Sequence, residues 1–214
     1  MFQALLLGLA SSIVNFSGVD LTIPHPKGYC LPSGNAELTA QQFAAADSGS
    51  VTKLTLVNCD PRLTFEDYLN VKVPAHAVDL TMNRPEFLEL MRKTFASAGF
   101  SEFVKSGKAQ SAVEGHYRAV GAKDAKVAGG LVPRKIDETC GYLGGDMTVT
   151  SGGQTKSMTA AACMTSIGGR IMSLYAIKPK GDNGSYESLF VELRQWAQSI
   201  EKTASASGRS KPGR

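Results

Sequence analysis

Cysteine is the residue type in this chain that is best placed to do chemistry. The 214 residues hold four cysteines, Cys30, Cys59, Cys140 and Cys163, all downstream of a short apolar N-terminal segment. An even number of cysteines behind such a segment is typical of an exported protein with two disulfides, because disulfides persist in oxidising compartments. Four reduced, buried cysteines in a cytosolic protein are the alternative, since free cysteine is among the most buried residue types. We expect two disulfides.

The glycines of the C-terminal half suggest how two of the cysteines pair. A glycine turn at 152–153 would join two antiparallel strands. If Gly144 and Gly145 form a bulge that takes up two residues, Cys140 faces Cys163 across these strands, close enough for a disulfide. If the two glycines form a tight turn instead, this pairing fails.

Cys30 and Cys59 remain as the second pair. Cys30 follows the first expected strand, Cys59 ends the second, and a helix is expected between them. A bond there would close the strand–helix–strand unit, and each closure of this kind contributes about 3 kcal/mol by constraining the unfolded chain. Disulfide formation would also explain the cysteines without any role as nucleophiles.

Histidine offers the other possible chemistry. His25, His76 and His116 lie far apart in the sequence, without the closely spaced Cys or His pairs of a structural zinc site. There is no G-x-S-x-G motif, and no G-x-G-x-x-G follows an expected strand. Hydrolase chemistry would therefore need one histidine to meet a serine or cysteine on folding. We predict no catalytic, cofactor-binding or metal-binding residue.

The N-terminal segment predicts export. Phe2 to Leu9 form a short apolar run, followed by the small residues Ala10, Ser11 and Ser12, which is typical of a cleaved signal peptide over residues 1–18. The run is too short to span a membrane, which takes about 20 residues. No Lys or Arg precedes it, and the alternative is an N-terminal strand or helix packed on the core. We expect a periplasmic or secreted protein, with a cytoplasmic location as the alternative.

The charge is concentrated at the C-terminus. Four of the 23 Lys and Arg residues lie in 202–214, and the rest are balanced by 19 Asp and Glu residues, so the net charge of +4 belongs to the tail. Residues 1–201 carry no net charge, so they have no general electrostatic field that would attract nucleic acid. We expect residues 203–214 to be disordered, since they are poor in apolar side chains. Residues 19–202 are then a single domain with no transmembrane segment.

Hydrophobic periodicity predicts an α+β fold. A helix with Asn83 or Thr81 as its N-cap is clear, with Gly99 as its C′ residue. The segment 100–121 is ambiguous between helix and irregular structure, and the Gly- and Ala-rich segment 123–133 is expected to be a loop. The other expected helices are 35–46 and 185–202, and the expected strands are 19–24, 51–59, 68–73, 136–142, 147–150, 156–165 and 170–177.

The C-terminal segment TAAACMTSIGGRIMSLYAIKPKGDNGSYESLFVELRQWAQSIEK resembles the end of domains in the PsbP/Mog1-like superfamily. The opening LTIPHPKGYC is similar to how those domains begin, and the chain also resembles small exported bacterial proteins. The resemblance implies an α/β/α sandwich with a central, mainly antiparallel sheet and a packed C-terminal helix. It also implies an accessory or binding protein, and it supplies no catalytic residue.

These observations together favour an exported, non-enzymatic accessory or binding protein. Its partner would be an unknown protein or small ligand, and no cofactor is expected. A periplasmic hydrolase that uses a histidine with a Cys or Ser nucleophile is the alternative.

Overall fold

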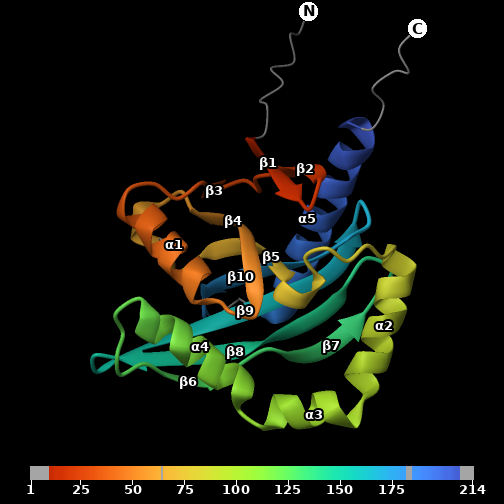
Figure 1. The fold of residues 1–214 in the computed structure, drawn as a ribbon. Coiled ribbons are helices and arrows are strands. Elements are labelled where there is room, and N and C mark those ends of the chain that lie inside the picture. Colours follow the sequence, from red (N-terminus) through yellow and green to blue (C-terminus); the bar gives the residue numbers. More distant parts are fainter. Residues whose placement is uncertain (1–9, 64, 182–184, 208–214) are drawn as a thin grey trace, which may run out of the picture.

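The computed structural model describes residues 10–63, 65–181 and 185–207. Within them, eight strands form one antiparallel sheet in the order β3-β4-β5-β10-β9-β8-β6, and β7 also pairs with β8 (Figure 1). Strands β1 and β2 form a separate hairpin. The strands are β1 (Ser11–Phe16), β2 (Val19–Pro24), β3 (Tyr29–Cys30), β4 (Ser50–Asn58), β5 (Tyr68–Pro74), β6 (Lys126–Gly129), β7 (Val132–Ile136), β8 (Gly141–Ser151), β9 (Gln154–Ile167) and β10 (Arg170–Pro179).

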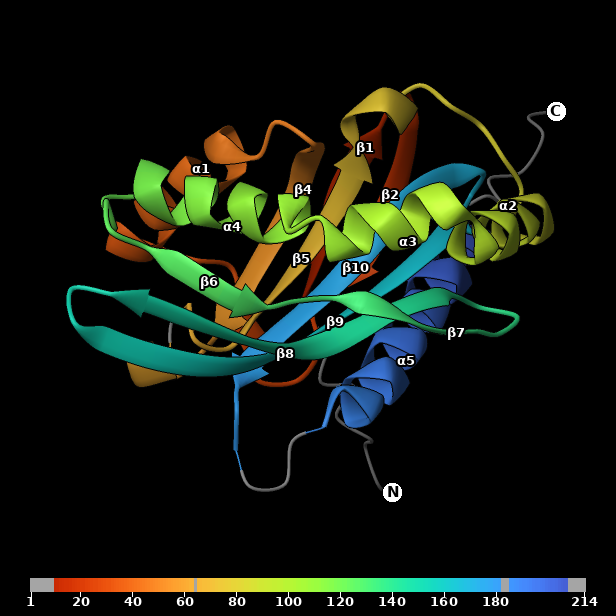
Figure 2. The ribbon, with the colours of Figure 1, turned by 90° about the horizontal axis from the view of Figure 1, so that it is seen from below.

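Helices cover both faces of the sheet, so the α/β/α sandwich and the mainly antiparallel sheet are confirmed. Helix α5 lies on one face, and the other helices line the opposite face (Figure 2). The helices are α1 (Asn35–Ala46), α2 (Arg84–Ala96), α3 (Ala98–Lys105), α4 (Lys108–Ala119) and α5 (Tyr186–Ser207), with short 3-10 turns η1 (Pro61–Leu63) and η2 (Ala75–Ala77). No described helix combines the length and apolar character needed to cross a bilayer.

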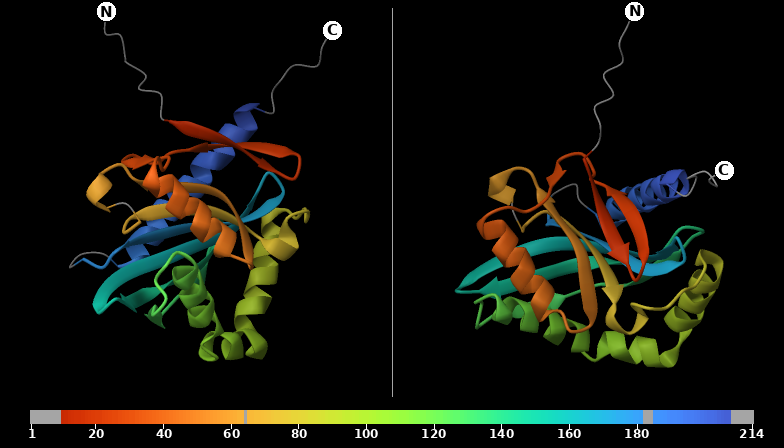
Figure 3. Two further views of the ribbon diagram at one scale, coloured as in Figure 1. Left: turned by 60° about the vertical axis from the view of Figure 1, so that its left-hand side comes forward. Right: turned by 45° about the horizontal axis from the view of Figure 1, so that its top comes forward.

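The main core lies between the sheet, the β1–β2 hairpin and α5. Helix α5 buries one stripe at helical spacing, including Phe190, Leu193 and Ile200. Trp196, expected at the edge of this stripe, is also buried, and its indole Nε1 donates to the Pro24 carbonyl at 2.8 Å. This hydrogen bond attaches α5 to the hairpin, which lies beside it (Figure 3).

The hairpin occupies residues that the sequence assigned to a signal peptide. Val14 and Phe16 of β1 are buried in the core, and the turn at Ser17–Gly18 leads into β2. Residues 11–18 thus adopt the packed strand that was the alternative for this segment. Residues 1–9 lie outside the described part of the chain, and cleavage stays a prediction. At the other end, α5 runs to Ser207 rather than 202, and 208–214 are not described.

Residues 97–133 hold more regular structure than their sequence predicted. The Asn83 side chain caps α2 by accepting from the Glu86 N–H at 3.0 Å, as expected. Gly99, however, lies inside α3 rather than at the C′ position of α2, and the expected loop at 123–133 contains β6 and the start of β7.

The expected strand at 136–142 is wrong. It is interrupted at Asp137, whose carboxylate Oδ1 accepts from the N–H groups of Thr139 at 2.8 Å and Cys140 at 2.9 Å. An Asp that bonds its own downstream backbone forms a turn, so β7 ends at Ile136 and β8 begins at Gly141.

Candidate functional site

Both predicted disulfides are present. Cys30 bonds Cys59, and Cys140 bonds Cys163, with Cα–Cα distances of 5.3 and 5.2 Å. The four cysteines are thus all oxidised, which leaves none as a nucleophile.

The route by which Cys140 reaches Cys163 differs from the predicted one. Strands β8 and β9 pair in one continuous register, without a bulge, and Tyr142 rather than Cys140 lies opposite Cys163. Cys140 precedes the first residue of β8 and reaches its partner diagonally. Neighbours at this diagonal position lie close enough for side chains to meet.

The two glycines assigned to the bulge have another physical role. A Cβ on Gly144 would lie 2.7 Å from Phe190 Cζ of α5, and one on Gly145 would lie 2.2 Å from the carbonyl oxygen of Gly130. Glycine is therefore required where α5 and the link between β6 and β7 approach the strand closely.

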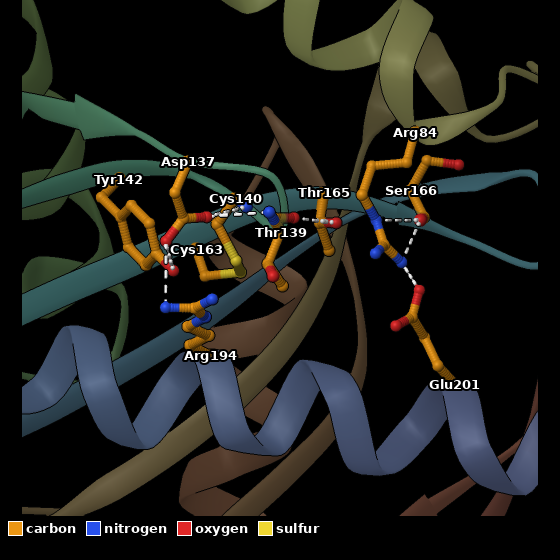
Figure 4. Close-up of a disulfide and its surroundings, with 10 residues drawn as sticks. All are labelled: Arg84, Asp137, Thr139, Cys140, Tyr142, Cys163, Thr165, Ser166, Arg194 and Glu201. Carbon is orange, nitrogen blue, oxygen red and sulfur yellow. Dashed lines mark hydrogen bonds and ion pairs between the residues drawn. A yellow bond between two sulfur atoms is a disulfide. The ribbon is translucent and has the colours of Figure 1, made fainter.

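Polar bonds fix the turn beside the buried disulfide (Figure 4). Asp137 Oδ2 accepts from the Tyr142 hydroxyl at 3.0 Å, and Arg194 of α5 makes ion pairs with Asp137 and Glu138. Burial, followed by the bond to Asp137, raises the pKa of Tyr142. These contacts hold the Cys140–Cys163 disulfide as a structural staple with no open position for a reactant.

The three histidines are on separate elements: His25 follows β2, His76 lies in η2 and His116 in α4. His25 is buried, and its Nε2 lies 2.9 Å from the Ser12 hydroxyl. Burial lowers the pKa of His25. Among the described residues no carboxylate contacts His25, so the pair lacks the acidic group that orients the histidine of a catalytic triad.

Two adjoining hollows lie between the helical layer α1–α4 and the sheet, and we call them together the interlayer cavity. Its central part has a volume of about 410 Å³ and its apolar part about 570 Å³. The two parts share the walls Val113, Leu131, Met147 and Tyr175, so they adjoin.

Strand β5 supplies polar side chains to the central part. Tyr68, Asn70 and Lys72 lie on the face that the helices cover, whereas Leu69, Val71 and Val73 lie in the main core. Asn70 Oδ1 accepts from the Thr55 hydroxyl at 2.8 Å, and Asn70 is opposite Tyr175 in the neighbouring strand.

An ion pair stands at the edge of this polar row. Lys72 Nζ lies 2.7 Å from Asp47 Oδ2 and 5.6 Å from the centre of the Tyr175 ring. Asp47 Oδ1 accepts from the Gly49 and Ser50 N–H groups, at 3.1 and 3.0 Å. Burial opposes ionisation of Asp47, but the bond and charge of Lys72, aided by His116 and the Gly49 N–H, lower its pKa.

His116 completes the cluster from α4. Its Nε2 lies 3.9 Å from Asp47 Oδ1. Burial lowers the pKa of His116, opposed by the charge of Asp47 and reinforced by that of Lys72. The imidazole is therefore neutral at pH 7, and the Asp47–Lys72–His116 cluster has no net charge.

Apolar surface lies on either side of this polar centre. On one side four aromatic rings meet: Phe43 lies 6.0 Å from Phe65 and 5.6 Å from Tyr117, and Phe65 lies 6.0 Å from Tyr68. These rings also border an outer hollow of about 530 Å³ next to the β8–β9 hairpin. On the other side the apolar part is walled largely by hydrophobic side chains of α2–α4 and β6–β8.

Apart from His116, which was considered only as a possible hydrolase histidine, the sequence analysis did not single out these cavity residues. The feature of the sequence that could have indicated them is the alternation in YLNVKV at residues 68–73, where every second residue is polar. Such a pattern normally indicates a strand with one face on the core and the other exposed to solvent. Only the helical cover from α1 and α4 turns that face into a cavity wall, and α4 lies in the segment left ambiguous.

A comparison with solved structures returns several similar chains. The structure is similar to the solution structure of cyanobacterial PsbP (CyanoP) from Synechocystis sp. PCC 6803, with a TM-score of 0.31 and 10% sequence identity. The alignment covers 85% of this chain and 84% of that one.

The comparison returns a protein of the kind that the sequence resembles. No protein-family model and no curated protein sequence matches the chain. Because one fold hosts unrelated functions, function here has to be argued from the chain's own residues.

Proposed function

We propose that this is a non-enzymatic binding protein of an oxidising compartment, which holds a small amphipathic molecule in the interlayer cavity. The observation that carries the proposal is the polar row Asn70–Lys72–Tyr175 on a helix-covered sheet face, between two apolar regions. Ligand sites are typically pre-formed, mostly apolar hollows of about 300–1,000 Å³ with a few placed polar groups. Helices α1 and α4 then cover the central part of the site, and α2 to α4 help to wall its apolar part.

The charge of the cluster indicates the kind of ligand. Asp47 already neutralises Lys72, and His116 is neutral, so the site offers hydrogen bonds rather than a free charge. A hydroxyl, amide or amine head group next to Asn70 and Tyr175 suits this centre, with an apolar body along the aromatic or the apolar side. The two disulfides support the oxidising compartment, because such bonds are rarely kept in the cytosol.

Binding of a neutral fluorescent amine tests the proposal. N-phenyl-1-naphthylamine should bind the full chain saturably, with the fluorescence rise of an apolar site. Val113→Trp and Leu131→Trp each place a large ring where the central and apolar parts adjoin, and each should weaken binding about tenfold or more. Leu38→Trp adds the same ring at an exposed position of α1 and is the matched control.

Circular dichroism confirms that each variant is folded before binding is measured. Saturable binding that both blocking variants retain at full strength would contradict the proposed site. No saturable binding to the wild-type chain would contradict the proposal as a whole, at least for neutral amphipathic amines of this size.

The contact between Ser12 and His25 favours the hydrolase alternative to a limited degree. A fluorophosphonate probe, which labels activated serines, tests it directly. We expect no labelling of Ser12, because His25 has no acidic partner in the described part of the chain. Ser12 also lies within the predicted signal peptide, so cleavage after residue 18 would remove it.

The mass of the intact protein from its native host tests export. Before reduction and alkylation the mass reports the N-terminus, and after it the number of disulfides. Loss of residues 1–18 with two disulfides would support export and exclude a Ser12 enzyme.

A further inference from the structure

The two disulfides differ in how accessible they are to other thiols. Cys140 and Cys163 have no exposed surface, whereas Cys30 and Cys59 are both exposed. Thiol–disulfide exchange needs a thiolate to reach a sulfur atom, so exposure decides which disulfide reacts. Only the Cys30–Cys59 bond meets this condition.

The surroundings of this bond leave room for an attacking group. Both cysteines border a shallow groove of about 610 Å³, which also includes Leu31 and Phe65. Cys30 lies in β3, which has only two residues and stands at the edge of the sheet. Within the described residues, no strand pairs with the outer side of β3.

The bond joins two segments that meet again at the interlayer cavity. The chain after Cys30 enters α1, which carries Phe43, and the chain after Cys59 leads through η1 to Phe65. The rings of Phe43 and Phe65 lie 6.0 Å apart on the aromatic side of the cavity. The disulfide therefore ties together the starts of these two segments, and the rings of Phe43 and Phe65 further along them form this wall of the cavity.

Phe65 shows that the second segment is held against its local preference. Its φ of 59° is left-handed, a conformation that is strained for a bulky residue and persists only when neighbouring structure enforces it. Loosening one end of this segment gives that strain a route to relax.

We propose that Cys30–Cys59 is a thiol–disulfide exchange site for dithiol reductants, and that its reduction loosens α1 and residues 61–63 and 65–67. One thiolate of the dithiol attacks a sulfur of the bond, which forms a mixed disulfide and releases the other cysteine as a thiolate. The second thiol of the reductant then displaces the remaining cysteine. Cys30 and Cys59 end as thiols, having gained two electrons and two protons, and the dithiol ends as a disulfide. This site does not depend on the proposed function of the cavity.

Native reduction followed by alkylation tests the exchange site. The folded full-length chain is exposed to dithiothreitol, quenched with iodoacetamide at intervals, and digested for mass spectrometry. Cys30 and Cys59 should be alkylated at least about tenfold faster than Cys140 and Cys163, while the near-ultraviolet circular dichroism stays native. Alkylation of all four cysteines together, or of Cys140 and Cys163 first, would overturn the proposal.

Hydrogen–deuterium exchange tests the effect on α1. After selective reduction, the amides of α1 and of residues 62, 63 and 65–67 should exchange faster, while those of α2 stay unchanged. The Cys30→Ala, Cys59→Ala double variant should reproduce the faster exchange without reductant. Unchanged exchange at α1 in both the reduced protein and the double variant would show that the bond does not control this wall. Neither result depends on whether the cavity binds a ligand.

Discussion

Lys72 Nζ lies 2.7 Å from Asp47 Oδ2, and this bond joins the end of α1 to the middle of the sheet. The side chains are only 19% and 9% exposed, so each charge depends on the other for its stability in the folded state. The same pair marks the polar centre of the interlayer cavity. Unfolding measurements on variants of this pair report its contribution to the free energy of unfolding, separately from any contribution to ligand binding.

Replacing Lys72 by Met should lower the free energy of unfolding by about 3 kcal/mol, because it leaves the Asp47 carboxylate buried without its cation. Urea unfolding measures the loss. Adding Asp47→Asn should recover part of it, since the uncompensated charge is gone. Lys156→Met is the control: its pair with Glu66 is 59% and 38% exposed, and exposed pairs contribute less than about 1 kcal/mol. Equal losses in the two lysine variants would contradict the account of the buried pair.

Acid should destabilise the fold in two stages. The folded state lowers the pKa of His116 and His25 below the ordinary 6.5, chiefly through burial. The unfolded chain therefore takes up protons first as the pH falls below about 6.5, and the free energy of unfolding decreases. Asp47 has its pKa lowered below the ordinary 3.8, so its contribution is present above that pH and is lost as the pH falls through the folded-state value.

Urea unfolding at pH 7 and pH 5 measures the first stage. His116→Gln should reduce the difference between the two values, whereas His76→Gln, at an exposed position, should leave it unchanged. A wild-type stability that is the same at pH 7 and pH 5 would argue against buried, neutral histidines.

Removing the buried disulfide should cost more stability than removing the exposed one. The double variant Cys140→Ala, Cys163→Ala removes a disulfide that closes a loop of 23 residues, which should lower the free energy of unfolding by about 3 kcal/mol. It also leaves unfilled space in the core, which lowers stability further. Cys30→Ala with Cys59→Ala opens a closure of 29 residues at the surface and leaves no core cavity. Thermal or urea unfolding of the two double variants gives the comparison. A larger loss at the surface pair would contradict this ranking.

The sequence predicted the features that depend on neighbouring residues. The Asn83 cap and the glycine turn at 152–153 follow from local chemistry, and the structure confirms both. Both cysteine pairs were also predicted, but the register at Cys140 was not. Glycine in a strand indicates either a bulge or a close contact, and Phe190, which decides between them at Gly144, is 46 residues away.

The cavity could not be predicted for a similar reason. Asn70 and Lys72 alternate with apolar residues as they would in a strand with one wet face. Whether that face meets water or a helix depends on how α1 and α4 pack over it, and the residues that form α4 gave no clear assignment because their periodicity is weak. The site is thus a property of the tertiary packing and not of any short motif.

The contact between Gly144 and α5 gives the last prediction. Gly144→Ala places a methyl group 2.7 Å from Phe190 Cζ and 2.9 Å from Tyr186 Cδ2, and Phe190 is buried and has no free space to move into. Overpacking of this kind should lower the free energy of unfolding by about 1–3 kcal/mol. Gly115→Ala is the matched control, because Gly115 is exposed in the middle of α4 with nothing within 4 Å of the added methyl group. It should raise stability by about 0.5–1 kcal/mol, the usual gain of Ala over Gly inside a helix. If Gly144→Ala were as stable as the wild type, the bulge interpretation of Gly144 would regain its support, since a bulge leaves room that this close packing does not.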